Sequence, residues 1–227
     1  MAEVELRLTD EHSRRLWSSV ADLTELLPAE WVLVGGLMVQ LYALEAGVER
    51  IRATIDVDVL GQGRPPGALA AIDEALGHDG FELQLPADGV VRRYLRGALI
   101  VDVLVPDGMR DGIGVPGGSQ ALARSESVTI RLDGRSFVLR RPTLLGAILI
   151  KARSLLVHRD PEAQREDLLL LLSLVDDPRA MSEQMKRSER RWLRDATERL
   201  EFDRPANIGA DRIRLARLTH RLLLQES

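Results

Sequence analysis

Residues 31–60, WVLVGGLMVQLYALEAGVERIRATIDVDVL, decide how the rest of the chain is arranged. The stretch opens with an apolar run at 32–34, which predicts a brief buried strand. Gly35 and Gly36 end the run, and glycine allows the backbone to turn sharply. Good helix formers dominate residues 37–46, so we expect a helix whose first-turn N–H groups lie at or just after the glycines. Such a helix N-terminus attracts anions.

The end of this stretch, TIDVDVL, alternates apolar and acidic residues. On a β-strand, this period of two places Ile55, Val57 and Val59 on one face and both carboxylates, Asp56 and Asp58, on the other. Two like charges about 7 Å apart repel each other and contribute nothing to folding. Carboxylate oxygens in this arrangement are suited to a hard cation such as Mg²⁺.

Two interpretations of the paired aspartates compete. A D-x-D pair on a solvated strand face is often only polar surface. The Gly-Gly turn upstream, together with Arg52 and Thr54 directly before the aspartates, favours the metal site.

The order of these features resembles the nucleotidyltransferases of the polymerase-β superfamily, in which a Gly-Gly or Gly-Ser turn opens a helix and D-x-D follows on the next strand. The version in this chain, GG followed by R-A-T-x-D-V-D, is similar to the AbiEii-type toxin nucleotidyltransferases and related minimal nucleotidyltransferase-like proteins. The likeness covers about residues 30–175. It implies an α/β (α+β) fold, a mixed β-sheet flanked by helices and followed by a C-terminal helical subdomain.

Length and composition exclude several classes of protein. The chain has 227 residues, enough for a full hydrophobic core. It has no cysteine, which excludes disulfides and thiolate metal sites. It contains no G-x-S-x-G, H-E-x-x-H, Walker or Rossmann motif. A leader and an apolar run of membrane-spanning length are also absent, so we expect a cytoplasmic protein with no membrane partner.

The net charge of −4 is unevenly distributed. Residues 1–139 carry 13 basic and 21 acidic groups, whereas residues 140–227 carry 18 and 14. The net charges of the two parts are therefore −8 and +4. The overall charge argues against general affinity for nucleic acid, but the basic rear part can meet a phosphate backbone.

Two helices are expected in the first part besides the one after the glycines. The amphipathic segment 9–27 predicts a helix capped by Thr9 or Asp10. Residues 68–77 predict a second helix, opened by Pro65 or Pro66 and stopped by Gly77. Strands are expected at residues 81–85, 90–97, 98–106 and 128–139, with hairpin turns at 97–98 and 133–134. The glycine-rich segment 106–120 is interpreted as a substrate lid or as a plain connector.

Asp102 is the next candidate site residue. It is a single carboxylate within the apolar run 99–105, and a charge there is costly unless it is paired or bound to metal. The alternatives are an edge-strand residue pointing at water or an ion pair with Arg92 or Arg93 on the neighbouring strand. The resemblance implies that Asp102 is the third carboxylate of the site, and we take it as the third metal ligand.

After Pro142 the pattern becomes helical, which predicts two domains, residues 1–140 and 141–227. Helices are expected at 142–156, 161–175, 179–200 and 210–225. Lys151 and the later Asp167 resemble a pair that helps to close the active site in AbiEii-type proteins. The alternatives are a lysine that extends along the helix edge to solvent and an aspartate that pairs with Arg153 or Arg165. The four histidines, His12, His78, His158 and His220, have no metal-ligand spacing and are expected at the surface.

The resemblance implies a reaction, the transfer of a nucleoside monophosphate from a nucleoside triphosphate (ATP or another) to an acceptor hydroxyl. Asp56, Asp58 and Asp102 would bind Mg²⁺ or Mn²⁺, and two metal ions are a known way to run an in-line displacement. The backbone of Gly35 and Gly36 would bind phosphates. In addition, Arg52 or Lys151 would neutralise developing charge, and Thr54 would assist with its hydroxyl.

The acceptor is left open by the sequence. The resemblance allows a tRNA end, a protein or a small molecule, and it allows a toxin that an antitoxin partner restrains. The basic rear part favours RNA or protein. The competing hypotheses are a catalytically inactive nucleotide-binding or scaffold protein with the same fold and a phosphohydrolase that uses the same carboxylates.

Overall fold

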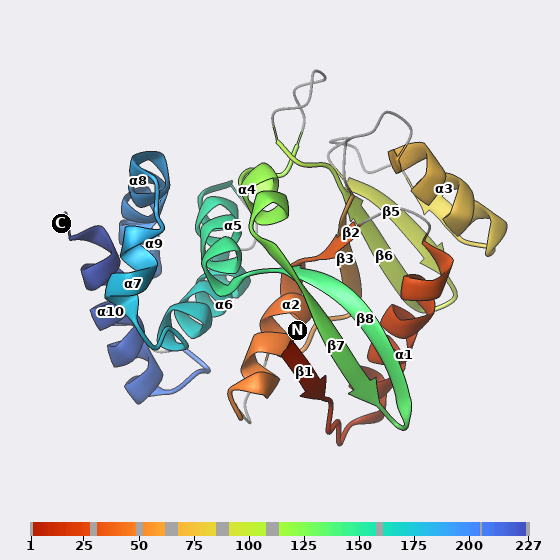
Figure 1. Ribbon diagram of the computed structural model, residues 1–227, viewed down its shortest axis with the longest axis horizontal. Coiled ribbons are helices and arrows are strands. Elements are labelled where there is room, and N and C mark those ends of the chain that lie inside the picture. Colours follow the sequence, from red (N-terminus) through yellow and green to blue (C-terminus); the bar gives the residue numbers. More distant parts are fainter. Residues whose placement is uncertain are drawn as a thin grey trace. The chain divides into compact units, whose positions relative to one another are not determined.

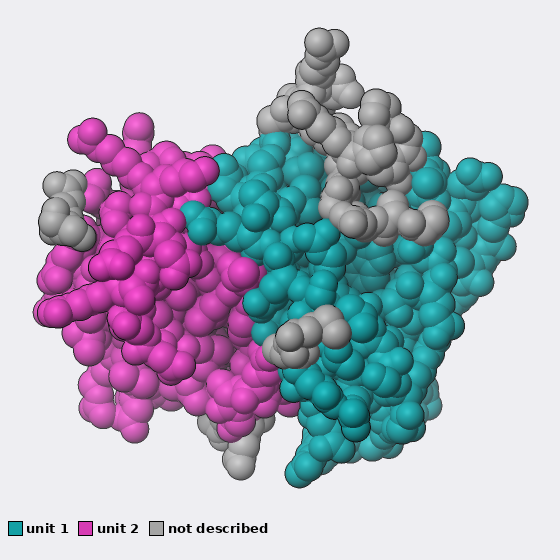
Figure 2. Space-filling view, viewed as in Figure 1, with its two compact units in different colours: residues 1–38, 53–142 teal, residues 39–52, 143–227 magenta. Residues whose placement is uncertain are grey.

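The computed structural model describes residues 2–27, 31–48, 52–61, 68–84, 91–107, 114–157, 161–204 and 206–225. The chain divides into two compact units, coloured separately in Figure 2. Unit 1 comprises residues 1–38 and 53–142, and unit 2 comprises residues 39–52 and 143–227. The helix after the glycines, α2 (Gly35–Glu45), begins in unit 1 and ends in unit 2. The domains expected from the sequence, residues 1–140 and 141–227, place residues 39–52 in the first domain. The structure groups these residues with the helical unit instead.

The main sheet of unit 1 is mixed and has five strands in the order β2-β3-β6-β5-β4 (Figure 1). The central pair, β3 and β6, is parallel, and the other neighbours are antiparallel. These strands are β2 (Trp31–Leu33), β3 (Asp56–Gly61), β4 (Glu82–Gln84), β5 (Val91–Arg96) and β6 (Leu99–Leu104).

Alternation along the two central strands builds the core of this sheet. Val57 and Val59 on β3 are completely buried, as are Val101 and Val103 on β6. The prediction for Ile55 is wrong, because Ile55 precedes β3 and is 62% exposed. The hairpin between β5 and β6 turns at residues 97–98, as predicted.

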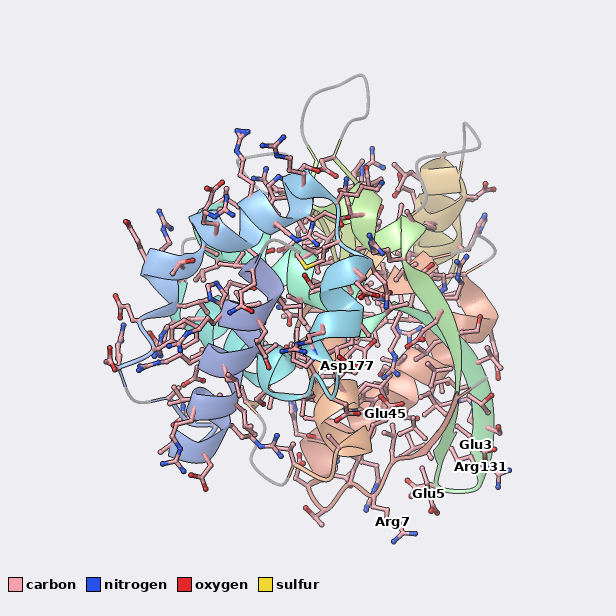
Figure 3. The ribbon with its side chains drawn as sticks, turned by 60° about the vertical axis from the view of Figure 1, so that its left-hand side comes forward. Glu3, Glu5, Arg7, Glu45, Arg131 and Asp177 are labelled. Carbon is pink, nitrogen blue, oxygen red and sulfur yellow. The ribbon has the colours of Figure 1, made fainter. Side chains whose placement is uncertain are left out.

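A second sheet of unit 1 has three strands in the order β1-β7-β8: β1 (Ala2–Glu5), β7 (Ser125–Leu132) and β8 (Arg135–Pro142). Asp133 and Gly134 both have positive φ (48° and 81°), which is the geometry of the predicted two-residue hairpin. Figure 3 shows Glu3 of β1 beside Arg131 of β7, with which it forms a salt bridge. Charged side chains on a short edge strand discourage pairing with another chain.

The helices of unit 1 are α1 (Glu11–Leu26), α3 (Ala68–His78) and α4 (Gly118–Ala123). Asp10, one of the two predicted caps, accepts from the Ser13 N–H at 2.7 Å. Gly77 does not stop α3, because Gly80 ends it with φ of +79°. The expected opening prolines of α3 and residues 108–113 of the glycine-rich segment lie outside the described residues, and α4 occupies the end of that segment.

Unit 2 is helical apart from its connections. Its helices after α2 are α5 (Leu144–Val157), α6 (Pro161–Ser173), α7 (Pro178–Glu183), α8 (Arg187–Asp195), α9 (Thr197–Leu200) and α10 (Ala210–Leu224). Leu168 to Leu172 of α6 are all buried because α6 packs between α5 and α10. Within the described part of the chain, no helix combines the length and apolar character needed to cross a bilayer.

The single helix expected over residues 179–200 is three helices. The first break comes at Gln184 to Lys186, where Glu189 accepts from the Lys186 backbone N–H at 2.7 Å. This is half of a capping box, and it starts a new helix in the middle of a helical pattern. Asp177, which Figure 3 labels, caps α7 by accepting from the N–H groups of Arg179 and Ala180.

The expectation of surface histidines fails for His220. His12 and His78 are exposed and His158 lies outside the described residues, but His220 is 5% exposed. Its Nε2 lies 3.3 Å from the Leu193 carbonyl and 3.3 Å from the Thr197 hydroxyl, and its ring packs on Phe202. Burial lowers the pKa of His220, opposed by the bond to the Leu193 carbonyl.

We expect this histidine to make unit 2 less stable in acid. The unfolded chain takes up a proton near pH 6.5, before the buried ring does, so stability is lost as the pH falls below about 6.5. Each unit between the two pKa values is worth about 1.4 kcal/mol. Denaturant unfolding from pH 7.5 to 5 measures the effect, and a His220→Gln variant should lose less stability over this range. An identical pH dependence in both proteins would show that His220 is not responsible.

Candidate metal centre

Unit 1 brings the three predicted carboxylates together. Asp56 and Asp58 lie two residues apart on β3, and Asp102 lies opposite Asp58 in the parallel register between β3 and β6. One ligand oxygen from each of the three lies within 4.8 Å of the others. Asp102 is buried and the other two are half-buried. We call Asp56, Asp58 and Asp102 the acidic triad.

Gly35 lies against the triad, and the reason is the pairing of β2 with β3. The Val34 N–H donates to the Asp58 carbonyl at 3.0 Å, which brings Gly35 next to the side chain of Asp58. A Cβ on Gly35 would lie 1.7 Å from Asp58 Oδ2, and its φ is +67°. Only glycine fits this position. Gly36 follows in the first turn of α2, where backbone N–H groups have no acceptor within the helix.

Thr54 positions Asp56. The Thr54 hydroxyl donates to Asp56 Oδ1 at 2.8 Å, and Thr54 itself is buried. Its carbonyl lies 3.1 Å from Nε2 of His12 on α1, which ties the start of β3 to that helix. The hydroxyl that was expected at the nucleotide therefore orients a triad carboxylate in this structure.

Arg93 is a residue of this site that the sequence interpretation did not assign to it. It lies opposite Asp102 in the antiparallel register between β5 and β6. Its Nε donates to Asp102 Oδ1 at 2.8 Å and its Nη2 to Asp102 Oδ2 at 2.7 Å. The hydrogen bonds to Asp102, opposed in part by burial, raise the pKa of Arg93 above its ordinary value, and the charges of Asp102, Asp56 and Asp58 raise it further.

The neighbouring strand residues show why Arg93 rather than Arg92 takes this place. Successive side chains on a strand point to opposite faces. Arg92 forms a salt bridge with Asp73 of α3, and the Tyr94 hydroxyl donates to the same carboxylate at 2.5 Å. The ion pair between Asp102 and Arg93, which the sequence analysis gave as an alternative to metal binding, therefore exists, and its carboxylate is also a member of the triad.

In unit 2, three other predicted residues form a cluster. Lys151 Nζ donates to Asp167 Oδ2 at 2.8 Å and to Gln164 Oε1 at 3.1 Å, and Arg52 forms a weaker pair with Asp167 at 3.4 Å. Lys151 is 4% exposed, so the alternative of a lysine extending to solvent is wrong. Charges this deeply buried persist only when they are paired.

The suggested partners of Asp167 have other roles. Arg165 is buried and donates to the backbone carbonyls of Leu200 and Glu201. The guanidinium of Arg153 lies 5.0 Å above the ring of Trp192. Asp167 therefore pairs with Lys151 and orients it.

The chemistry of the triad fits a divalent cation. It offers three carboxylates, which Mg²⁺ and Mn²⁺ accept as hard oxygen ligands. Thr54 fixes one of them and Gly35 leaves room for another. Three carboxylates in such proximity repel one another, and a cation relieves the repulsion.

No protein-family model matches the chain, and no curated protein matches its sequence. A solved structure does match: the crystal structure of an antigenic nucleotidyltransferase-like protein from Paracoccidioides brasiliensis. The TM-score is 0.53 at 16% identity, over 89% of this chain and 94% of the other. At this identity the likeness shows the fold alone. The expected nucleotidyltransferase-like fold, with mixed sheets flanked by helices, is confirmed, and the AbiEii-type assignment stays a prediction.

Proposed function

We propose that this chain is a metal-dependent nucleotidyltransferase, which transfers a nucleoside monophosphate from a nucleoside triphosphate to an acceptor hydroxyl. The observation that carries the proposal is the acidic triad, held by two adjacent strands beside a helix N-terminus. The nucleotidyltransferase-like fold supports it. A scaffold protein would have no need to keep three mutually repelling carboxylates together.

The residues of unit 1 suit this reaction. Mg²⁺ or Mn²⁺ held by Asp56, Asp58 and Asp102 would supply Lewis-acid stabilisation of the phosphoryl oxygens. The backbone N–H groups of Gly35 and Gly36 would bind phosphate oxygens of the donor. Asp102 would accept the proton of the attacking hydroxyl.

The proposal also includes two cations of unit 2, Arg52 and Lys151, which are expected to act on the nucleotide. Both are already paired with Asp167, which fixes their positions. We propose that Lys151 and Arg52 neutralise charge on the donor phosphates, and that Thr54 acts through the position of Asp56.

A label-transfer assay tests the proposal. The purified chain is incubated with Mg²⁺ or Mn²⁺, each α-labelled nucleoside triphosphate in turn, and a mixture of cellular RNA and protein. Transfer of label to RNA or protein by the wild type, and not by an Asp56→Ala/Asp58→Ala double variant, would establish the activity. Tight nucleotide binding without transfer would favour the inactive nucleotide-binding protein or a small-molecule acceptor. Released phosphate or pyrophosphate without transfer would indicate a hydrolase.

Among acceptors, we propose RNA, because of α8. Arg187, Arg191 and Arg194 are exposed, and helical geometry places them within an arc of about 60°. None of the three forms a salt bridge with a carboxylate of the described residues. The opposite face of α8 is buried through Glu189 and Leu193. We call these three arginines the α8 basic face, and it complements a phosphate backbone.

We expect the triple change of the α8 basic face to glutamine to weaken binding of the acceptor RNA about tenfold at low salt. Each lost phosphate contact should lower the slope of log K against log salt by about 0.7 to 0.9. Fluorescence anisotropy with labelled RNA measures both. The control removes three exposed arginines that pair with carboxylates in unit 1, Arg7, Arg15 and Arg131. An equal loss in the control would show that only net charge matters.

A toxin role belongs to the same proposal. A nucleotidyltransferase that modifies tRNA would stop growth when it is expressed alone. Growth arrest on expression that requires the triad, and that a neighbouring gene product relieves, would support a toxin–antitoxin pair acting in the cytoplasm.

A further inference from the structure

The proposed reaction leaves one cation of the site without a role. The guanidinium of Arg93 engages both oxygens of Asp102, at 2.8 Å and 2.7 Å. The register of the sheet places Arg93, Asp102 and Asp58 in one row across β5, β6 and β3. Arg93 is therefore a positive charge at the end of the row of carboxylates that would hold a metal ion.

Arg93 and a divalent ion compete for the same charge. The triad carboxylates stabilise both cations, and two positive charges bound to the same carboxylates repel each other. Arg93 is bonded directly to Asp102, and the nearby charges of Asp56 and Asp58 also stabilise its guanidinium. A metal ion that binds Asp102 therefore weakens the ion pair between Asp102 and Arg93.

The two partners differ in how freely they can move. The Asp102 side chain is 7% exposed and belongs to a central strand, whereas the Arg93 side chain is 44% exposed. Once a metal ion replaces it at the buried Asp102, a long, half-exposed arginine side chain can leave the pair at small cost, since water can solvate its charged end. Arg93 is thus the partner that moves.

We infer that Arg93 has two positions in the working protein. Without ligand it neutralises the triad; when metal and nucleotide bind, it releases Asp102 and binds the phosphates of the nucleotide. A guanidinium suits both partners, because its N–H groups pair with two oxygens of a carboxylate or of a phosphate. The inference rests on the proposed function for its nucleotide ligand, and it makes Arg93 a residue that contacts substrate.

Two binding measurements on the Arg93→Gln variant test this exchange, and they should change in opposite directions. Without nucleotide, the variant should bind Mn²⁺ about tenfold more tightly than the wild type, because a competing charge is gone. At saturating Mn²⁺, it should bind the α,β-methylene analogues of ATP, GTP, CTP and UTP, tested in turn, about tenfold more weakly wherever the wild type binds. Calorimetry measures both affinities without any turnover.

The matched control is Arg96→Gln, which removes the same charge from the same strand. Arg96 pairs with Asp79, away from the triad. The Arg96→Gln variant should keep a Mn²⁺ affinity within about twofold of that of the wild type, since screening weakens the effect of distant charges. If Arg93→Gln is less stable, its melting temperature should rise more with Mn²⁺ than that of the wild type, because metal then supplies the missing counter-ion.

Unchanged or weaker Mn²⁺ binding by Arg93→Gln would overturn the inference and make Arg93 a fixed positioning residue for Asp102. Tighter Mn²⁺ binding without weaker nucleotide binding would overturn the second position. The proposed function is tested separately: a wild type that transfers label while Arg93→Gln binds Mn²⁺ normally refutes only the exchange. A wild type that binds no Mn²⁺ refutes both.

Discussion

Replacement of Asp56 by asparagine is expected to reduce nucleotidyl transfer by about a thousandfold or more, without loss of stability. Asparagine keeps the oxygen that accepts from Thr54, so the local structure is retained. What disappears is one of three negative charges whose ligand oxygens lie within 4.8 Å of one another. The same change in Asp58 or Asp102 should also abolish transfer.

The Asp56→Asn variant should therefore lose activity without losing stability. Removing the charge of Asp56 from the triad should leave the free energy of unfolding unchanged or raise it by on the order of 1 kcal/mol. Urea unfolding measures this, and Mn²⁺ titration should show metal binding lost. Asp22→Asn is the matched control, because Asp22 is an exposed partner of Arg135 outside the triad and should leave transfer unchanged. Full transfer by Asp56→Asn would refute the proposed function.

Replacement of Gly35 by alanine is expected to damage the site more than any other single added methyl group among the described glycines. The new Cβ would lie 1.7 Å from Asp58 Oδ2, so the carboxylate must move out of the triad. The residue would also be held at φ of +67°, which costs about 1–2 kcal/mol. With the clash included, we expect a destabilisation of about 3 kcal/mol and complete loss of metal binding.

Gly80→Ala separates the effect of the positive φ from the effect of the clash with Asp58. Gly80 has φ of +79°, but nothing lies within 4 Å of its added Cβ. It should therefore lose only the backbone contribution, about 1–2 kcal/mol, and keep its Mn²⁺ affinity. Thermal unfolding and Mn²⁺ calorimetry on both variants measure the difference. Similar behaviour of the two would mean that the contact between Gly35 and Asp58 is unimportant.

Most strands of unit 1 could be predicted because their signals are local, although β1 and the division into two sheets were not predicted. Alternation assigned β3, an apolar run assigned β6, and the turn residues assigned the two hairpins. The helical half was predicted less well. The break between α7 and α8 depends on a cap that Glu189 provides within a continuous helical pattern. Burial of His220 depends on the packing of α10, which its own sequence does not reveal.

For the candidate site, the sequence determined which carboxylates share a face: Asp56 and Asp58 are two residues apart on one strand, and side-chain direction repeats every two residues. Only the tertiary structure decided that Asp102 lies opposite Asp58 and that Arg93, not Arg92, reaches it. Both depend on strand register, which contacts between distant segments fix, and a slip of one residue would exchange the two arginines. The contact of Gly35 with Asp58 and the pairing of Lys151 with Asp167 likewise come from residues brought together only when the chain folds.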